Sequence, residues 1–91
     1  IGDRAFYSCS RLTTISFPAA TLIGYTVFYY CTNLTTIYLL NSSICSLYAS
    51  NAFYSTKITS TTGSIFVPAS LVASYKAATN WAYFSNRIFG V

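Results

Sequence analysis

The chain has 91 residues, enough for one domain, with five basic side chains against a single acidic one for a net charge of +4. Hydrophobic residues make up 54% and charged residues 7%, against roughly 25% charged residues in ordinary soluble domains, so hydroxyl and amide groups must supply most of the surface polarity. The basic residues are scattered, which argues against a nucleic-acid surface, and no apolar run approaches the roughly 18 residues that span a bilayer.

The composition also excludes most enzyme chemistry. The chain has no His and no Glu, and Asp3 is its only carboxylate side chain. Paired-carboxylate hydrolysis, a Ser-His-Asp triad and a Cys-His dyad are therefore excluded within these residues. Three cysteines without a histidine cannot complete a zinc shell. We predict no catalytic residue, no metal site and no cofactor.

One stretch of the chain occurs twice. Residues 1–15 are matched by residues 23–37, with every matched pair 22 residues apart. A fixed period of about 20 to 29 residues is typical of leucine-rich-repeat solenoids. Near the end of each copy, apolar and polar residues alternate, which predicts strands at 14–17 and 36–39. Pro18 ends the first strand, since proline cannot donate to a ladder. The chain opens without methionine and inside a repeat, so we expect further repeats on its N-terminal side.

The rest of the chain departs from the period. A third, degenerate copy is recognisable at Ala52-Phe53, and its strand is expected at 64–67 after an inserted turn at 60–63. After Pro68 the apolar spacing becomes helical, and residues 69–91 are predicted to form a helical C-terminal cap. The predicted fold is a short, right-handed α/β repeat solenoid. Residues 1–68 supply about two and a half repeats and a narrow parallel sheet of three strands.

The motif Ile-Gly-x-x-Ala-Phe-x-x-Cys-x-x-Leu-Thr-x-Ile-x-x-Pro at residues 1–18 resembles the BspA-like, or Treponema pallidum-type, leucine-rich repeats. Residues 65–81 look like the segment that often closes such arrays in proteins of gut Firmicutes and their phages. The second copy departs from the motif at Val27 and Leu40, and the third lacks the Cys. The resemblance implies a bacterial protein that is secreted or displayed at the cell surface, or a structural protein of a phage particle. Such proteins act by adhesion to host matrix, cells or carbohydrate.

Two rows of side chains are candidates for binding, because they alternate with the inward isoleucines of the predicted strands. Aromatic residues on an exposed face are common interface anchors. We hypothesise that Ser16, Tyr38 and Phe66 line a patch for a protein or glycan. The alternative is that stacked side chains only stabilise neighbouring coils. The two candidate rows are Thr14, Thr36 and Ser64, and Ser16, Tyr38 and Phe66.

Two further sets of residues recur with the period. Tyr7, Tyr29 and Tyr54 each follow the repeat phenylalanine and are predicted to form a ladder outside the turn, where stabilisation of the stack is the favoured interpretation. Cys9 and Cys31 are expected to stack at about the 4.8 Å strand spacing, as buried free thiols in preference to a disulfide. Cys45 has no partner in register.

Two functions fit these observations. The first is a binding or adhesion module with a protein or glycan ligand. The second is structural self-assembly into an oligomer or filament, because the outer edge of the first strand is unpaired and low charge favours association. The resemblance implies that the protein lies outside the cell, at its surface or in a phage particle, and neither function involves nucleic acid or a membrane span.

Overall fold

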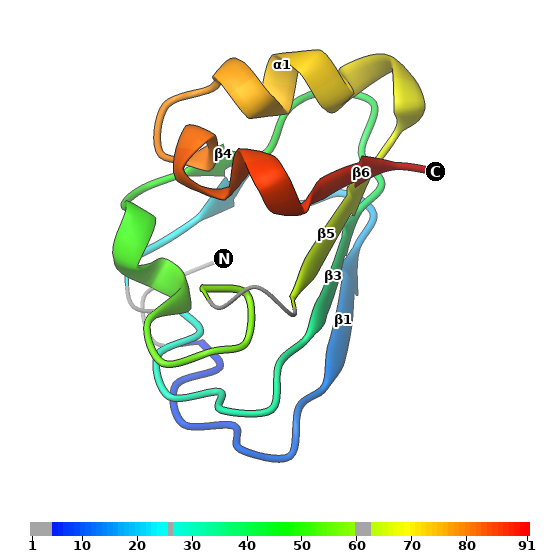
Figure 1. Cartoon of the computed structure of the whole chain (residues 1–91). Helices are drawn as coiled ribbons and strands as arrows, with labels where there is room; N and C mark the ends of the chain where they lie inside the picture. Colours follow the sequence, from blue (N-terminus) through cyan, green and yellow to red (C-terminus); the bar gives the residue numbers. More distant parts are fainter. Residues whose placement is uncertain (1–4, 26, 60–62) are drawn as a thin grey trace.

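The computed structural model describes residues 5–25, 27–59 and 63–91. In these ranges the strands are β1 (Thr14–Phe17), β2 (Leu22–Ile23), β3 (Thr36–Leu39), β4 (Ser46–Leu47), β5 (Ser64–Val67) and β6 (Ile88–Gly90) (Figure 1). The helical elements there are the 3-10 helices η1 (Ser50–Phe53), η2 (Ala69–Leu71) and η3 (Trp81–Arg87), and the α-helix α1 (Val72–Ala77). The start of the repeat motif at residues 1–4 and most of the predicted turn, at residues 60–62, lie outside the described residues.

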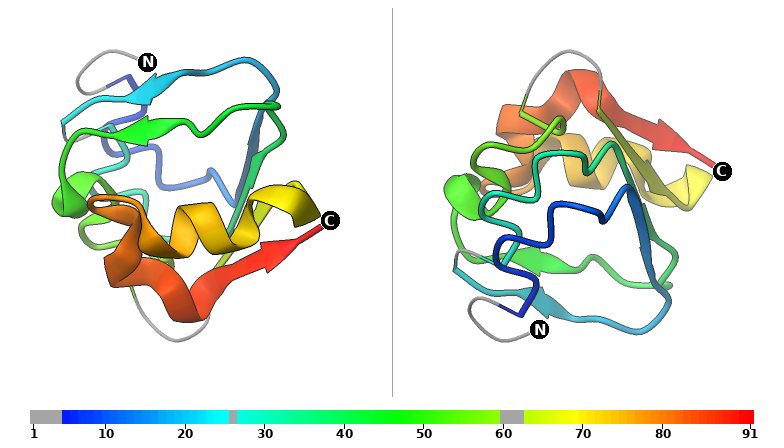
Figure 2. Two further views of the ribbon diagram at one scale, coloured as in Figure 1. Left: turned by 90° about the horizontal axis from the view of Figure 1, so that it is seen from above. Right: turned by 90° about the horizontal axis from the view of Figure 1, so that it is seen from below.

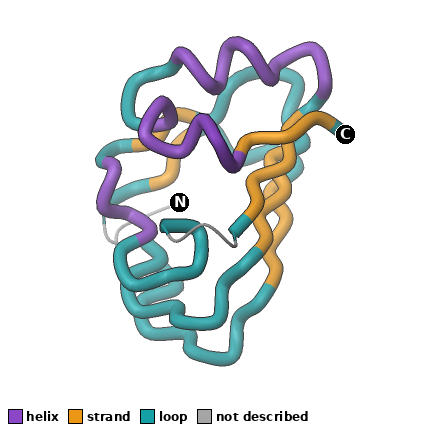
Figure 3. Tube along the Cα trace, in the orientation of Figure 1, coloured by secondary structure: helices purple, strands orange, loops and turns teal. Residues whose placement is uncertain are grey.

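The main sheet follows the repeat period. Its strands lie in the order β1-β3-β5-β6, and every neighbouring pair is parallel. β1, β3 and β5 occupy the three predicted ranges, and Ile15, Ile37 and Ile65 align across them. Figure 3 shows these strands side by side along one wall of the molecule. The prediction of parallel strands at 14–17, 36–39 and 64–67 is therefore confirmed.

The sheet has a fourth strand that the sequence did not reveal. β6 pairs with β5 in parallel, with Ile65 opposite Ile88 and Phe66 opposite Phe89. The segment before β6 contains no copy of the repeat motif, so the repeat period does not predict a strand there. A second, smaller sheet pairs β2 with β4 (Figure 2). Its two-residue strands are too short for a polar–apolar alternation to be visible.

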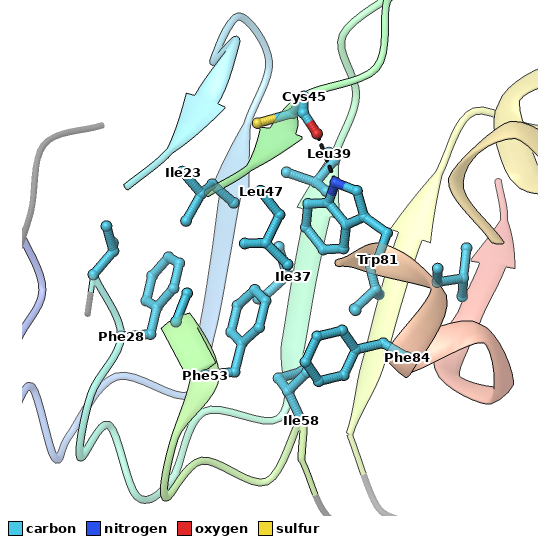
Figure 4. Close-up of a cluster of buried hydrophobic side chains, with 14 of the residues drawn as sticks. Ile23, Phe28, Ile37, Leu39, Cys45, Leu47, Phe53, Ile58, Trp81 and Phe84 are labelled. Carbon is cyan, nitrogen blue, oxygen red and sulfur yellow. Dashed lines mark hydrogen bonds between the residues drawn. The ribbon is translucent and has the colours of Figure 1, made fainter. Parts of the chain in front are cut away.

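Stacked phenylalanines form the centre of the core. Phe28 lies parallel to Phe6 at 5.6 Å and to Phe53 at 5.4 Å between ring centroids. Phe84 of η3 meets Phe53 edge-on at 5.3 Å, so the stack ends against the C-terminal segment (Figure 4). Phe28 and Phe53 are fully buried, whereas Phe6 is half-buried. The repeat phenylalanines thus form one continuous column through the molecule.

In the third repeat, the stretch from the phenylalanine to the next buried aliphatic residue is one residue shorter, from Phe53 to Ile58 where the second repeat runs from Phe28 to Leu34, and Thr56 stands in the place of the cysteine. The Thr56 hydroxyl donates a hydrogen bond to the Phe53 carbonyl at 2.7 Å and accepts one from the Ile58 amide at 3.1 Å. These bonds close a tight turn that brings Ile58 to a fully buried position. Gly63 then passes so close that a β-carbon would lie 2.5 Å from the Ile58 Cα. Only glycine fits there.

The C-terminal segment, residues 69–91, covers the end of the third repeat in two ways. β6 pairs with the outer edge of β5. Side chains from the same segment bond the backbone around β4. The Trp81 indole donates to the Cys45 carbonyl at 2.7 Å (Figure 4), and the Cys45 amide donates to the Tyr75 hydroxyl at 2.7 Å. The Asn80 amide donates to the carbonyls of Leu47 and Tyr48. The predicted helical segment is thus helical at 69–77 and 81–87 but ends as a strand.

Candidate binding surfaces

The first surface is the outward face of the main sheet. Ser16, Tyr38, Phe66 and Phe89 lie in register across the four strands. The rings of Tyr38 and Phe66 stack at 5.1 Å with a 19° interplanar angle, and Phe66 meets Phe89 at 5.9 Å and 40°. Phe89 is 44% exposed. Sequence reasoning missed it because it found no signal for β6. We call this set the sheet row.

The second predicted row lies beside the first on the same face, two residues earlier in each strand. Thr14 is opposite Thr36, which is opposite Ser64. Thr14 is exposed, and the other two are half-buried. The Thr36 hydroxyl lies 3.4 Å from the Thr35 hydroxyl. The structure therefore brings all six predicted site residues onto one face, with a strip of hydroxyl groups next to the sheet row.

The tyrosine ladder is confirmed. Tyr7 and Tyr29 stack at 6.1 Å, and Tyr29 and Tyr54 lie 5.1 Å apart with a 39° tilt. The ladder gains a fourth ring from Tyr30, which lies edge-on to the other three. The repeat period could not indicate Tyr30, because serine occupies the matching positions in the other two copies.

The buried groups that could titrate are poor nucleophiles. Burial raises the pKa of the Cys31 and Cys45 thiols, and it raises the pKa of the Tyr75 hydroxyl. Each of these groups therefore stays protonated at neutral pH, and a protonated thiol does not attack. All three cysteines are free. Cys31 is buried as predicted, whereas Cys9, for which burial was also predicted, is only half-buried; Cys45 is buried as well. The Cys31 thiol donates to the Phe6 carbonyl at 2.8 Å.

In the described part of the chain, no group of three or more His, Cys, Asp or Glu side chains is placed to hold a metal ion. Over the same residues, no helix has the length and apolar character to cross a membrane.

The comparisons with known proteins give one match. A family model described as a BspA type leucine-rich repeat region (6 copies) matches residues 1–85. Neither a curated protein nor a solved structure matches the chain.

Proposed function

Because the chain belongs to the BspA-type leucine-rich repeats, we propose that it is a non-catalytic binding module that recognises a protein ligand through the sheet row. In this proposal residues 1–68 form a short right-handed solenoid of about two and a half repeats, and residues 69–91 act as its cap. The module works at a bacterial cell surface, in a secreted protein or in a phage particle. An adhesive function requires such a location, because the ligand must be accessible there.

The observation that carries this proposal is the run of rings from Tyr38 through Phe66 to Phe89. Rings on neighbouring strands support one another, so little side-chain entropy is lost when a ligand covers them. Two of the three are phenylalanines, which offer no hydroxyl to a sugar. Apolar rings gain most from burial against apolar side chains, so a protein fits this face better than a glycan.

The hydroxyl strip beside the sheet row supports the same function. Interfaces between proteins combine an aromatic centre with a polar rim. Thr14, Thr36 and Ser64 supply hydroxyl donors and acceptors next to the rings. Ring stacking alone does not explain the row, because β1 carries Ser16 where the other strands carry rings. The fold tolerates a small polar residue at this position.

The test measures binding to immobilised extracellular-matrix and cell-surface proteins by surface plasmon resonance. The variant carries Tyr38→Ala and Phe66→Ala together, and the control carries Tyr83→Ala, which removes a ring that is 74% exposed on η3. We expect the double variant to bind the recognised protein at least about tenfold more weakly, as for interface anchors. The control should bind as the wild type does. The proposal is wrong if the wild type and the double variant bind with equal affinity while circular dichroism shows that both are folded.

Self-assembly is the second candidate function, and one observation favours it. β1 lies at the edge of the main sheet. Four apolar side chains of the first repeat, on β1 and before it, are only half-buried: Phe6, Leu12, Ile15 and Phe17. Another repeat could bury these side chains, supplied either by the parent chain on its N-terminal side or by a second copy. Light scattering over a dilution series tests this, since a monomer at all concentrations excludes assembly of the isolated chain.

A further inference from the structure

Six tyrosines form one connected cluster at a second place on the surface. Tyr30 contacts three of the others, with its ring centroid 5.7 Å from those of Tyr7 and Tyr29 and 5.9 Å from that of Tyr54. Its ring is nearly perpendicular to all three. Because the three ladder rings surround it at nearly equal distances, the cluster is a compact patch and not only a column.

Two more rings extend the patch. Tyr25 lies 6.4 Å from Tyr29, and Tyr48 meets Tyr25 edge-on at 6.1 Å. The Asn51 amide donates to the hydroxyls of Tyr29 and Tyr25, which ties these two phenols together. Five of the six side chains are between 40% and 61% exposed. We call the six residues the tyrosine surface; they are Tyr7, Tyr25, Tyr29, Tyr30, Tyr48 and Tyr54.

The backbone at Tyr30 shows that the fold does not require this ring. Ser8, Tyr30 and Ser55 occupy the same place in the three repeats and have positive φ angles of 59°, 60° and 61°. A bulky side chain is uncommon in this left-handed region. Serine serves in the first and third repeats, so the chain could use serine in the second. The ring of Tyr30 therefore adds something other than the turn.

The tyrosine surface lies away from the sheet row. Tyr7 precedes β1, whereas the other five tyrosines lie in the connections between β1 and β3 and between β3 and β5. η1, in the second of these connections, lies across the molecule from β1, β3 and β5 (Figure 1). A ligand on the tyrosine surface is thus a second ligand and does not rest on the function proposed for the sheet row.

The chemistry of the surface indicates the kind of ligand. Tyr7, Tyr29 and Tyr54 present the same phenol once per repeat, so a ligand with its own repeating unit meets the same group at each step. Phenols offer both ring carbons and hydroxyls, which match the C–H faces and hydroxyls of sugars. The six tyrosines and the Asn51 amide that joins two of them are all uncharged, so these groups offer a charged ligand no ion pair. We propose that the tyrosine surface binds a linear, uncharged polysaccharide.

The experiment uses affinity electrophoresis in gels that contain soluble mixed-linkage β-glucan, linear mannan or amylose, with cellohexaose and maltohexaose as competitors. We expect at least one of the three polysaccharides to retard the wild-type chain. Tyr30→Ser should weaken that binding by about tenfold or more, because Tyr30 contacts all three ladder rings. Tyr30→Ser should melt at the same temperature as the wild type, since serine occupies the matching positions of the first and third repeats. Tyr48→Ala, at the rim of the surface, should weaken binding less.

Two controls separate this proposal from the alternatives. Tyr83→Ser removes an exposed ring outside the tyrosine surface and should leave retardation unchanged. The pair Tyr38→Ala and Phe66→Ala removes the sheet row and should also leave it unchanged, which keeps the two surfaces distinguishable. The proposal is overturned if none of the polysaccharides retards the wild type or if Tyr30→Ser binds as tightly. Concentration-dependent self-association that disappears in Tyr30→Ser also overturns it, because the patch would then be a contact between copies.

Discussion

The first and second repeats carry the same apolar side chains, yet the structure buries them to different degrees. Phe28, Cys31, Leu34 and Ile37 are fully buried, whereas their counterparts 22 residues earlier are half-buried. Among the described residues, the second repeat has a repeat on each side, while β1 of the first ends the sheet. The burial of a side chain in this array is therefore decided by its neighbours and not by the motif that contains it.

The largest effect is expected from cutting the phenylalanine column at its middle. Phe28→Ala removes the ring that stacks on both Phe6 and Phe53 and leaves a closed cavity, so we expect a loss of about 3–5 kcal/mol. Phe6→Ala should cost about half as much, because its half-buried site is already open to water. Urea unfolding followed by circular dichroism gives both values. Equal losses at the two positions would contradict the role assigned to neighbours.

The third repeat extends the comparison. Phe53 is fully buried although no further repeat follows its own in the described residues. The C-terminal segment supplies the missing neighbour through Trp81 and Phe84. Trp81→Phe keeps an apolar ring but removes the donor to the buried Cys45 carbonyl, at a cost of about 1–3 kcal/mol.

The control for Trp81→Phe is Tyr83→Phe, which alters an exposed residue of the same helix. This control should leave the free energy of unfolding almost unchanged. Thermal unfolding compares the two variants with the wild type. A Trp81→Phe variant that melts with the wild type would show that the hydrogen bond to Cys45 contributes nothing.

The smallest effect is a loss of stability at alkaline pH. Burial raises the folded pKa of the Cys31 thiol above its ordinary value of 9.0. The unfolded chain therefore loses this proton first as pH rises past about 9, and stability falls until the folded pKa is reached. Each such group changes the free energy of unfolding by at most about 1.4 kcal/mol per pH unit. Cys45 and Tyr75 add slopes of the same sign.

Urea unfolding between pH 7 and pH 10.5 measures this slope. Cys31→Ala should flatten it, because it removes one of the groups whose pKa burial raises. An unchanged slope in Cys31→Ala would show that the thiol of the second repeat does not keep its proton in the folded state.

Much of the sheet face was predictable because its signals are local. Ile15 and Ile37 alternate with polar residues, and the period places them side by side, so the rows through Thr14 and Ser16 follow directly. The ladder of Tyr7, Tyr29 and Tyr54 follows in the same way. Phe89 did not follow, because β6 joins the sheet through pairing with β5, a long-range contact that no local pattern records.

The tyrosine surface was likewise predictable only in part. Its ladder residues repeat with the period, but Tyr30 occupies a position that is serine in both other copies. Its ring contacts the three ladder rings, an arrangement that no periodic signal indicates. Tyr25 and Tyr48 reach the patch from a different part of the coil.

The sequence by itself determined which residues form the column and the parallel strands, because a fixed period places equivalent side chains in contact whatever surrounds them. Only the tertiary structure decided how well each of them is buried. It also decided how the array ends: β6 completes one sheet, and Tyr75, Trp81 and Asn80 satisfy the backbone around β4. The two aromatic surfaces became complete only when residues without a periodic signal, Phe89 and Tyr30, joined those that have one.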